Sequence, residues 1–137
     1  MSIEAVSGSS LADWEHTFVA TSGSPNSVLD RAIERGSARQ VHIAAIACER
    51  IPVDQALAVC LVYMLEGDSH WGRAAARLLE RILGETGCSI ETAVPLAAAI
   101  AGGRASLPVL VAVLDELGLD RAASRADAVV RGGRPLA

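Results

Sequence analysis

The sequence predicts an all-α protein: a single domain of seven or eight short helices packed as antiparallel pairs. Its apolar runs are rich in Ala and Leu, which favour helix over strand, and none shows the period-two alternation of a strand. Capping residues and glycines bound these runs. The predicted connections are short, so successive helices must lie as antiparallel neighbours. With 51% apolar but only 3% aromatic residues, the core must consist of small aliphatic side chains that let helices approach closely.

The first expected helix covers residues 11–20. Residues 1–9 are small and polar, and we expect them to be flexible. Ser10 then serves as the N-cap, with Asp13 three positions later in a capping-box arrangement. A helix here places four apolar side chains on one side, namely Leu11, Trp14, Phe18 and Val19. Residues 21–26 form the loop that ends it.

Two further helices follow this loop. Ser27 caps a short one over residues 28–35, which Gly36 closes. Ser37 caps the next, over residues 38–49. Apolar side chains cover most sides of that second helix, which predicts a central place in the bundle.

The fourth and fifth helices give the clearest signals. Pro52 fits the first turn of a helix that runs to Glu66 and stops at Gly67, and we expect it to be the most buried element. The fifth covers residues 70–83 and stops at Gly84. One of its faces is apolar, whereas the other carries Arg73, Arg77, Glu80 and Arg81.

The sixth helix ends at Ala101, but its start is open because of Pro95. If Ser89 is the cap, this proline lies inside the helix and should kink it; if Thr92 is the cap, it falls in the tolerated first turn. Two more helices follow, over 107–117 and 121–131. The helical domain therefore spans 10–133, with a tail over 134–137. Helix pairs repeat at a spacing that fits either a bundle or a short α-solenoid-like array.

Charge and cysteine content exclude some classes of function. The net charge is −4 and all 12 basic residues are Arg. A net negative charge disfavours nucleic acid as a partner, because contacts of basic side chains with phosphates supply most of the affinity for it. Three cysteines without a CxxC motif, and no basic residue in the first ten positions, predict a cytoplasmic protein. The longest uninterrupted apolar run, 56–65, is too short to span a membrane.

The sequence offers no catalytic constellation, and we expect no catalytic residues, metal or cofactor. The three histidines lie on different predicted helices, and no second ligand follows any of them at a metal-binding spacing. Cys48 and Cys60 lie in apolar runs and should be buried and inert. Cys88 precedes a helix N-terminus, which would favour a reactive thiolate, but we interpret it as an ordinary loop residue.

One surface carries residue types that are enriched in protein interfaces. The expected partner-binding residues are Tyr63, His70, Trp71, Arg73, Arg77 and Arg81. The three arginines recur every four residues and so share one helix face. The alternative interpretation is that this face is an ordinary solvated surface without a partner. Because arginine and aromatic side chains dominate interface cores, we favour a non-enzymatic protein-interaction module that binds a protein partner or forms a homo-oligomer.

Two alternatives to this interaction module remain. The first is a small-molecule binding protein or a small enzyme, with a pocket between helices. The polar groups of that pocket would be His42 and Glu49, two turns apart on one helix, joined by Tyr63 or His70. Nucleic-acid binding through the arginine row is the third interpretation, and it predicts a steep dependence of affinity on salt.

The runs at 41–45, 51–57 and 73–79, with Ala and Leu at helical spacing, resemble a group of small uncharacterised all-helical proteins from high-GC bacteria. The similar part covers residues 28–101. The resemblance implies a helical fold and a bacterial cytoplasmic setting. The group carries no established activity, so it implies no functional residue.

Overall fold

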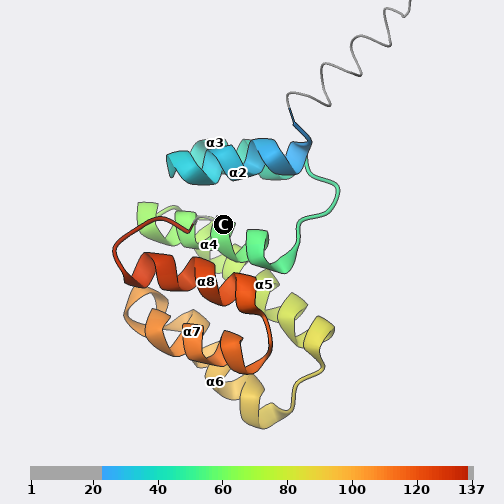
Figure 1. Cartoon of the computed structure of the whole chain (residues 1–137), viewed down its shortest axis with the longest axis vertical. Helices are drawn as coiled ribbons and strands as arrows, with labels where there is room; N and C mark the ends of the chain where they lie inside the picture. The colour runs from blue at the N-terminus through green and yellow to red at the C-terminus, as the bar shows by residue number, and fades with distance from the viewer. Residues whose placement is uncertain (1–22, 136–137) are drawn as a thin grey trace, which may run out of the picture.

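A computed structural model describes residues 23–135, and in this part the chain forms seven α-helices, one 3-10 turn and no strand (Figure 1). The elements are α2 (Pro25–Arg35), α3 (Ala38–Ile46), α4 (Val53–Glu66), α5 (Trp71–Thr86), α6 (Ile90–Ala101), the turn Gly103–Ser106, α7 (Leu107–Glu116) and α8 (Asp120–Val130). The all-α prediction is confirmed. The helix expected over 11–20 lies outside the described residues. None of the described helices is both long and apolar enough to cross a bilayer.

Helix α4 is the centre of the structure. The pairs α2–α3, α4–α5 and α6–α7 each pack together, as predicted for neighbours in the chain, and α4 also contacts α2, α3 and α8. Figure 1 shows α2 and α3 at one end of the molecule and α6 and α7 at the other. Two apolar clusters meet on α4: Leu57 and Leu61 face the cluster with α5 to α8, whereas Ala58 and Val62 face the cluster with α2 and α3. The expectation that this helix is the most buried one is confirmed.

The turn after α4 shows how the sequence ends a helix. Gly67 has φ +65°, in the left-handed region that glycine tolerates best. Its N–H donates to the carbonyl of Met64, and the next N–H, of Asp68, donates to the carbonyl of Tyr63. This is the Schellman pattern, which satisfies carbonyls that the helix end leaves open.

Several helix boundaries differ from the predicted ones. Helix α2 begins at Pro25 because Ser24, and not Ser27, is its N-cap; the Ser24 hydroxyl accepts from the Ser27 N–H. Helix α3 ends at Ile46, short of the predicted 49. Its last turn tightens, as the Cys48 N–H donates to a carbonyl three residues back, and the chain then extends toward a proline.

Helix α5 passes through Gly84, where we expected it to stop, and ends before Gly87. One glycine costs a helix only about 1 kcal/mol, and burial of Ile82 in the turn before it offsets that cost. The start of α6 is settled at Ser89, so Pro95 lies inside the helix.

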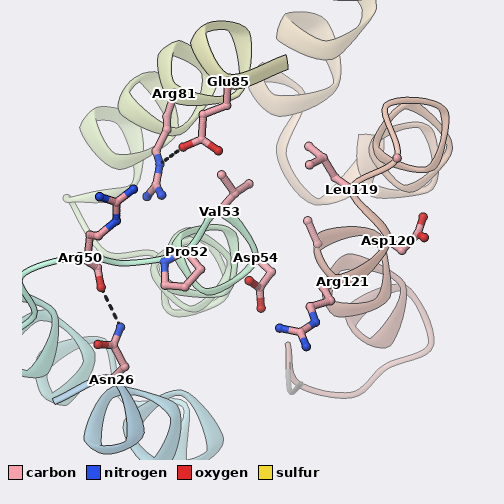
Figure 2. Close-up of a pocket in the computed structure, with 12 residues that line it drawn as sticks. Asn26, Arg50, Pro52, Val53, Asp54, Arg81, Glu85, Leu119, Asp120 and Arg121 are labelled. Atoms are coloured by element: carbon pink, nitrogen blue, oxygen red, sulfur yellow. Dashed lines mark hydrogen bonds and ion pairs between the residues drawn. The ribbon is translucent and has the colours of Figure 1, made fainter. Parts of the chain in front are cut away.

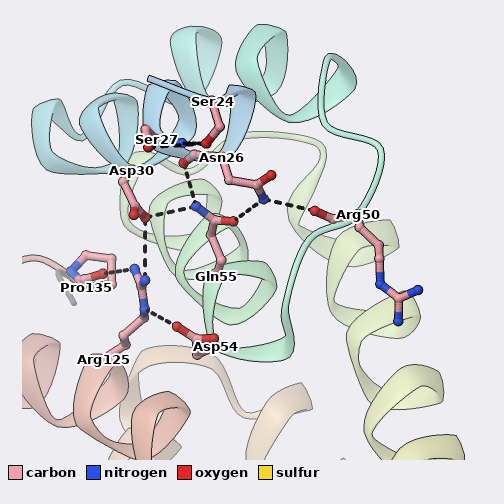
Figure 3. Close-up of polar contacts among 9 residues, drawn as sticks. All are labelled: Ser24, Asn26, Ser27, Asp30, Arg50, Asp54, Gln55, Arg125 and Pro135. Atoms are coloured by element: carbon pink, nitrogen blue, oxygen red, sulfur yellow. Dashed lines mark hydrogen bonds and ion pairs between the residues drawn. The ribbon is translucent and has the colours of Figure 1, made fainter. Parts of the chain in front are cut away.

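Two buried polar side chains hold the helices in place (Figure 3). Gln55 of α4, only 4% exposed, donates from Nε2 to the carbonyl of Asn26 and to Oδ1 of Asp30, and its Oε1 accepts from Nδ2 of Asn26. Both the nitrogen and the oxygen of its side-chain amide therefore have hydrogen-bond partners. The contacts fix the start of α2 against the first turn of α4.

Arg125 of α8, also 4% exposed, joins three parts of the chain. It donates to Asp54 at 3.1 Å and to the carbonyl of Pro135 at 3.1 Å, and it lies 3.5 Å from Asp30. Residues 134 and 135, assigned to a tail by the sequence, thus take part in the packing: Pro135 is buried, and Arg134 donates to the carbonyl of Glu34.

Candidate binding groove

A groove runs between α3 and α5, with α4 as its floor. Both outer helices pack on α4, but in the described part of the chain their backbones make no contact with one another. The groove has a volume of about 420 Å³. Four α4 residues at helical spacing form the floor: Ala56, Val59, Cys60 and Tyr63. The floor is thus apolar, apart from a thiol and one phenol.

The two walls differ in character. The α3 wall contributes His42, Ala45 and Ile46. The α5 wall has apolar residues near the floor and arginines toward solvent. It consists of His70, which directly precedes the helix, and of Arg73, Ala74, Arg77, Leu78 and Arg81 on one face of α5. An occupant would therefore meet aliphatic side chains below and on one side, and cations along the other.

A cluster of ring side chains closes one end. The rings of His42 and His70 stack across the groove, with centroids 4.2 Å apart. Nδ1 of His42 lies 3.2 Å from the Tyr63 hydroxyl, and Nδ1 of His70 lies 2.6 Å from the carboxylate of Asp68. Both ring nitrogens named here are already engaged, which leaves the two Nε2 atoms for an occupant.

Two groups in this cluster have shifted pKa values. The pKa of Asp68 lies below its ordinary value, first because the backbone N–H of His70 donates to it and second because the His70 ring does so too. Because His70 is the N-cap residue of α5, this contact orders the turn that leads into the helix and caps none of its first-turn N–H groups. The pKa of Tyr63 is raised, mainly by burial and in part by the charge of Asp68, so the phenol stays protonated at neutral pH.

Arg81 closes the other end. It donates to the carbonyl of Ile51, the residue that leads into α4, and it forms an ion pair with Glu85 at 2.8 Å. By contrast, Arg73 and Arg77 are exposed, and neither forms an ion pair with any residue in the described part of the chain. These two guanidinium groups are the ones available to an anionic occupant.

The structure brings most of the predicted site residues together. Tyr63, His70 and the three arginines, expected to bind a partner, line the groove, and so does His42, expected in a pocket. Trp71 does not: it is half-buried and packs against both apolar clusters. Glu49 does not either, because α3 ends before it and its side chain lies outside the groove.

Helix α3 is peripheral, so the prediction of a central place for it is wrong. Ile43 is 60% exposed and Ile46 is 71% exposed, and the second of these lines the groove. The sequence signal was present, because α3 is apolar on more sides than α2 and α4 can cover. Such an excess of apolar sides predicts burial within the fold, but a surface that another molecule covers has the same pattern.

The cysteines do not add chemistry to the groove. Burial raises the pKa of Cys60 to about 12, so its thiol stays protonated. Cys48 is half-buried rather than fully buried, and its pKa is also raised by burial. Cys88 is half-buried and lies before α6, away from the groove.

A second hollow, of about 740 Å³, lies on the side of α4 that faces α8 (Figure 2). Three arginines and three carboxylates border it: Arg50, Arg81, Arg121, Asp54, Glu85 and Asp120. Because the opposite charges are equal in number, the lining of this hollow carries no net formal charge. Arg81 belongs to both hollows and separates them.

Among residues 23–135, no three His, Cys, Asp or Glu side chains converge as a metal site would require. The chain matches no protein-family model, no curated protein and no solved structure.

Proposed function

We propose that this protein is a binding module whose groove between α3 and α5 accepts an acidic, amphipathic helix of a protein partner. One observation carries the proposal: an exposed aliphatic wall on α3 faces a row of cations on α5, across an apolar floor. A helix with apolar residues on one face and carboxylates beside them matches that arrangement in both polarity and charge.

The shape of the groove also supports a helical occupant. From His70 to Arg81 the α5 wall extends for about 16 Å, at 1.5 Å per residue, which equals some three turns of a helix. The exposed position of Ile46 and the open rim suit an elongated segment more than an enclosed small ligand.

The test uses a synthetic helical peptide with Leu at positions i, i+3, i+4 and i+7 and Glu elsewhere, labelled for fluorescence anisotropy. The full chain should bind it, and a peptide with Lys in place of Glu should not bind. Arg73→Ala with Arg77→Ala should weaken binding about fivefold, because two rim charges contribute about 1 kcal/mol together. Added salt should weaken it as well.

Matched controls separate the groove from the general surface. Arg39→Ala with Arg104→Ala removes two other exposed arginines and should leave binding unchanged. Ile46→Ser should weaken binding, whereas Ile90→Ser, at a residue that is 76% exposed on α6, should not. Equal effects of the groove and control variants would refute the proposed site.

One observation favours a second candidate, a small organic anion with an apolar part. His42, Tyr63 and His70 converge at one end of a 420 Å³ hollow, a volume typical of small-molecule pockets. Native mass spectrometry of gently purified protein distinguishes the two. An added mass of a few hundred daltons that is lost on denaturation would favour this candidate; a mass of whole chains alone would favour the module.

A further inference from the structure

We infer that residues 11–20 of the same chain occupy the groove as an internal ligand, which a partner helix must displace. The inference rests on the proposed function of the groove and adds its regulation. It commits to one occupant, the segment of this chain that precedes α2.

Charge and polarity match between segment and groove. Residues 1–22 contain three acidic side chains and no arginine, whereas the α5 wall presents three arginines. In a helix over 11–20, Leu11, Trp14 and Phe18 share one face, and Glu15 flanks it. That is the pattern the groove accepts: an apolar stripe with a carboxylate beside it, within reach of Arg73 or Arg77.

The aromatic content of the chain points the same way. Four aromatic residues are present in all, and two of them, Trp14 and Phe18, belong to the preceding segment. Large apolar side chains contribute most when they are removed from water. The groove offers the exposed apolar surface, at Ile46, that such side chains would cover.

The place where α2 begins puts the segment within reach. Asn26, in the first turn of α2, donates to the carbonyl of Arg50 at 2.9 Å, and the next residue, Ile51, lines the groove beside Arg81. Residues 21–24 can span about 13 Å when extended. A helix over 11–20 is about 15 Å long, which matches the wall from Arg81 back to His70.

A short linker makes even a weak contact effective. It gives the segment an effective concentration on the order of 1 mM at the groove. A segment that binds with a dissociation constant of about 100 μM would then occupy the groove about nine-tenths of the time. A partner helix would bind about tenfold more weakly than it would to an empty groove.

The direct test follows the emission of Trp14 in the full chain with Trp71→Phe, whose fold is verified by circular dichroism. We expect blue-shifted emission that is protected from acrylamide. Arg73→Glu with Arg77→Glu should shift it to the red, and so should Glu15→Arg. Combining all three substitutions should restore the blue emission, because the charges again oppose. Ile3→Ala with Val6→Ala, at two apolar residues that precede the segment, is the control and should have no effect.

Red emission in the starting protein, or blue emission that no charge reversal changes, would overturn the inference. A blue shift that grows with protein concentration would also overturn it, since the occupant would then be a second copy of the chain. In the peptide assay described above, Trp14→Ala with Phe18→Ala should raise the affinity about tenfold. If this variant and the full chain bind the peptide with equal affinity, and Arg73→Ala with Arg77→Ala still weakens binding, only the internal ligand is refuted. If neither protein binds the peptide, the proposed function is refuted.

Discussion

Arg125 connects α8 to two other helices and to residue 135, and its replacement by Ala should destabilise the fold by about 3 kcal/mol. Its side chain is 5% exposed, while those of its partners Asp54 and Asp30 are 16% and 48% exposed. Asp30 regains water when the arginine is lost, so its contact contributes little. The bonds to Asp54 and to the carbonyl of Pro135, both 3.1 Å, carry most of the loss.

Urea unfolding followed by circular dichroism measures this loss, provided that the slope of the transition is unchanged. Arg121→Ala, at an exposed residue of the same helix, is the control and should change stability by less than about 0.5 kcal/mol. In the double variant Asp54→Ala with Arg125→Ala, the loss should be smaller than the sum of the two single losses, because neither buried charge is left alone. If Arg125→Ala unfolds like the Arg121 control, the buried contacts do not stabilise the fold as argued.

Three further predictions concern single positions. Gly84→Ala should stabilise the protein by about 0.5 kcal/mol, since the residue is helical and its new Cβ meets no atom within 4 Å. Gly87→Ala, at φ +57°, should destabilise it by about 1 kcal/mol. Equal effects of the two substitutions on the free energy of unfolding in urea would contradict the boundary of α5. The Cys60 thiol should resist a thiol reagent at mildly alkaline pH until the chain unfolds, and rapid labelling of the native protein would contradict its burial. The pKa of Asp68 is lowered by folding, so its charge contributes stability above the ordinary value of 3.8 and loses that contribution as pH falls through the lower folded-state value. Asp68→Asn should remove this part of the acid sensitivity in thermal melts, and an unchanged pH profile would refute its origin.

The local pattern predicted much of the fold. Capping serines and stop glycines determine φ and ψ within a few residues, so the helix ends at Gly36 and Gly67 were correctly placed. The errors fell where two local signals compete. Ser24 and Ser27 can both cap α2, and a glycine such as Gly84 can either end a helix or lie inside one; packing decides between them.

The sequence predicted one part of the candidate site and not the other. The arginine row of α5 follows from its spacing, and so does the apolar face beneath it. That His42 stacks on His70 could not be predicted from the sequence. The backbones of α3 and α5 do not contact one another, so the distance between the two rings depends on how each helix packs on α4. The exposure of Ile46 could not be predicted either, because an apolar side chain on α3 has the same local pattern whether or not another helix covers it.

The sequence by itself determined that the described part of the chain is helical, where most of the individual helix boundaries fall, and that α5 has one basic face. Those properties depend on hydrogen bonds and side chains within a turn or two. Only the tertiary structure decided which helix faces remain uncovered, that they form a groove, and that Gln55 and Arg125 are buried. The ion pair of Arg125 joins residues 71 positions apart, and contacts at that separation depend on how whole helices pack, which periodicity does not record.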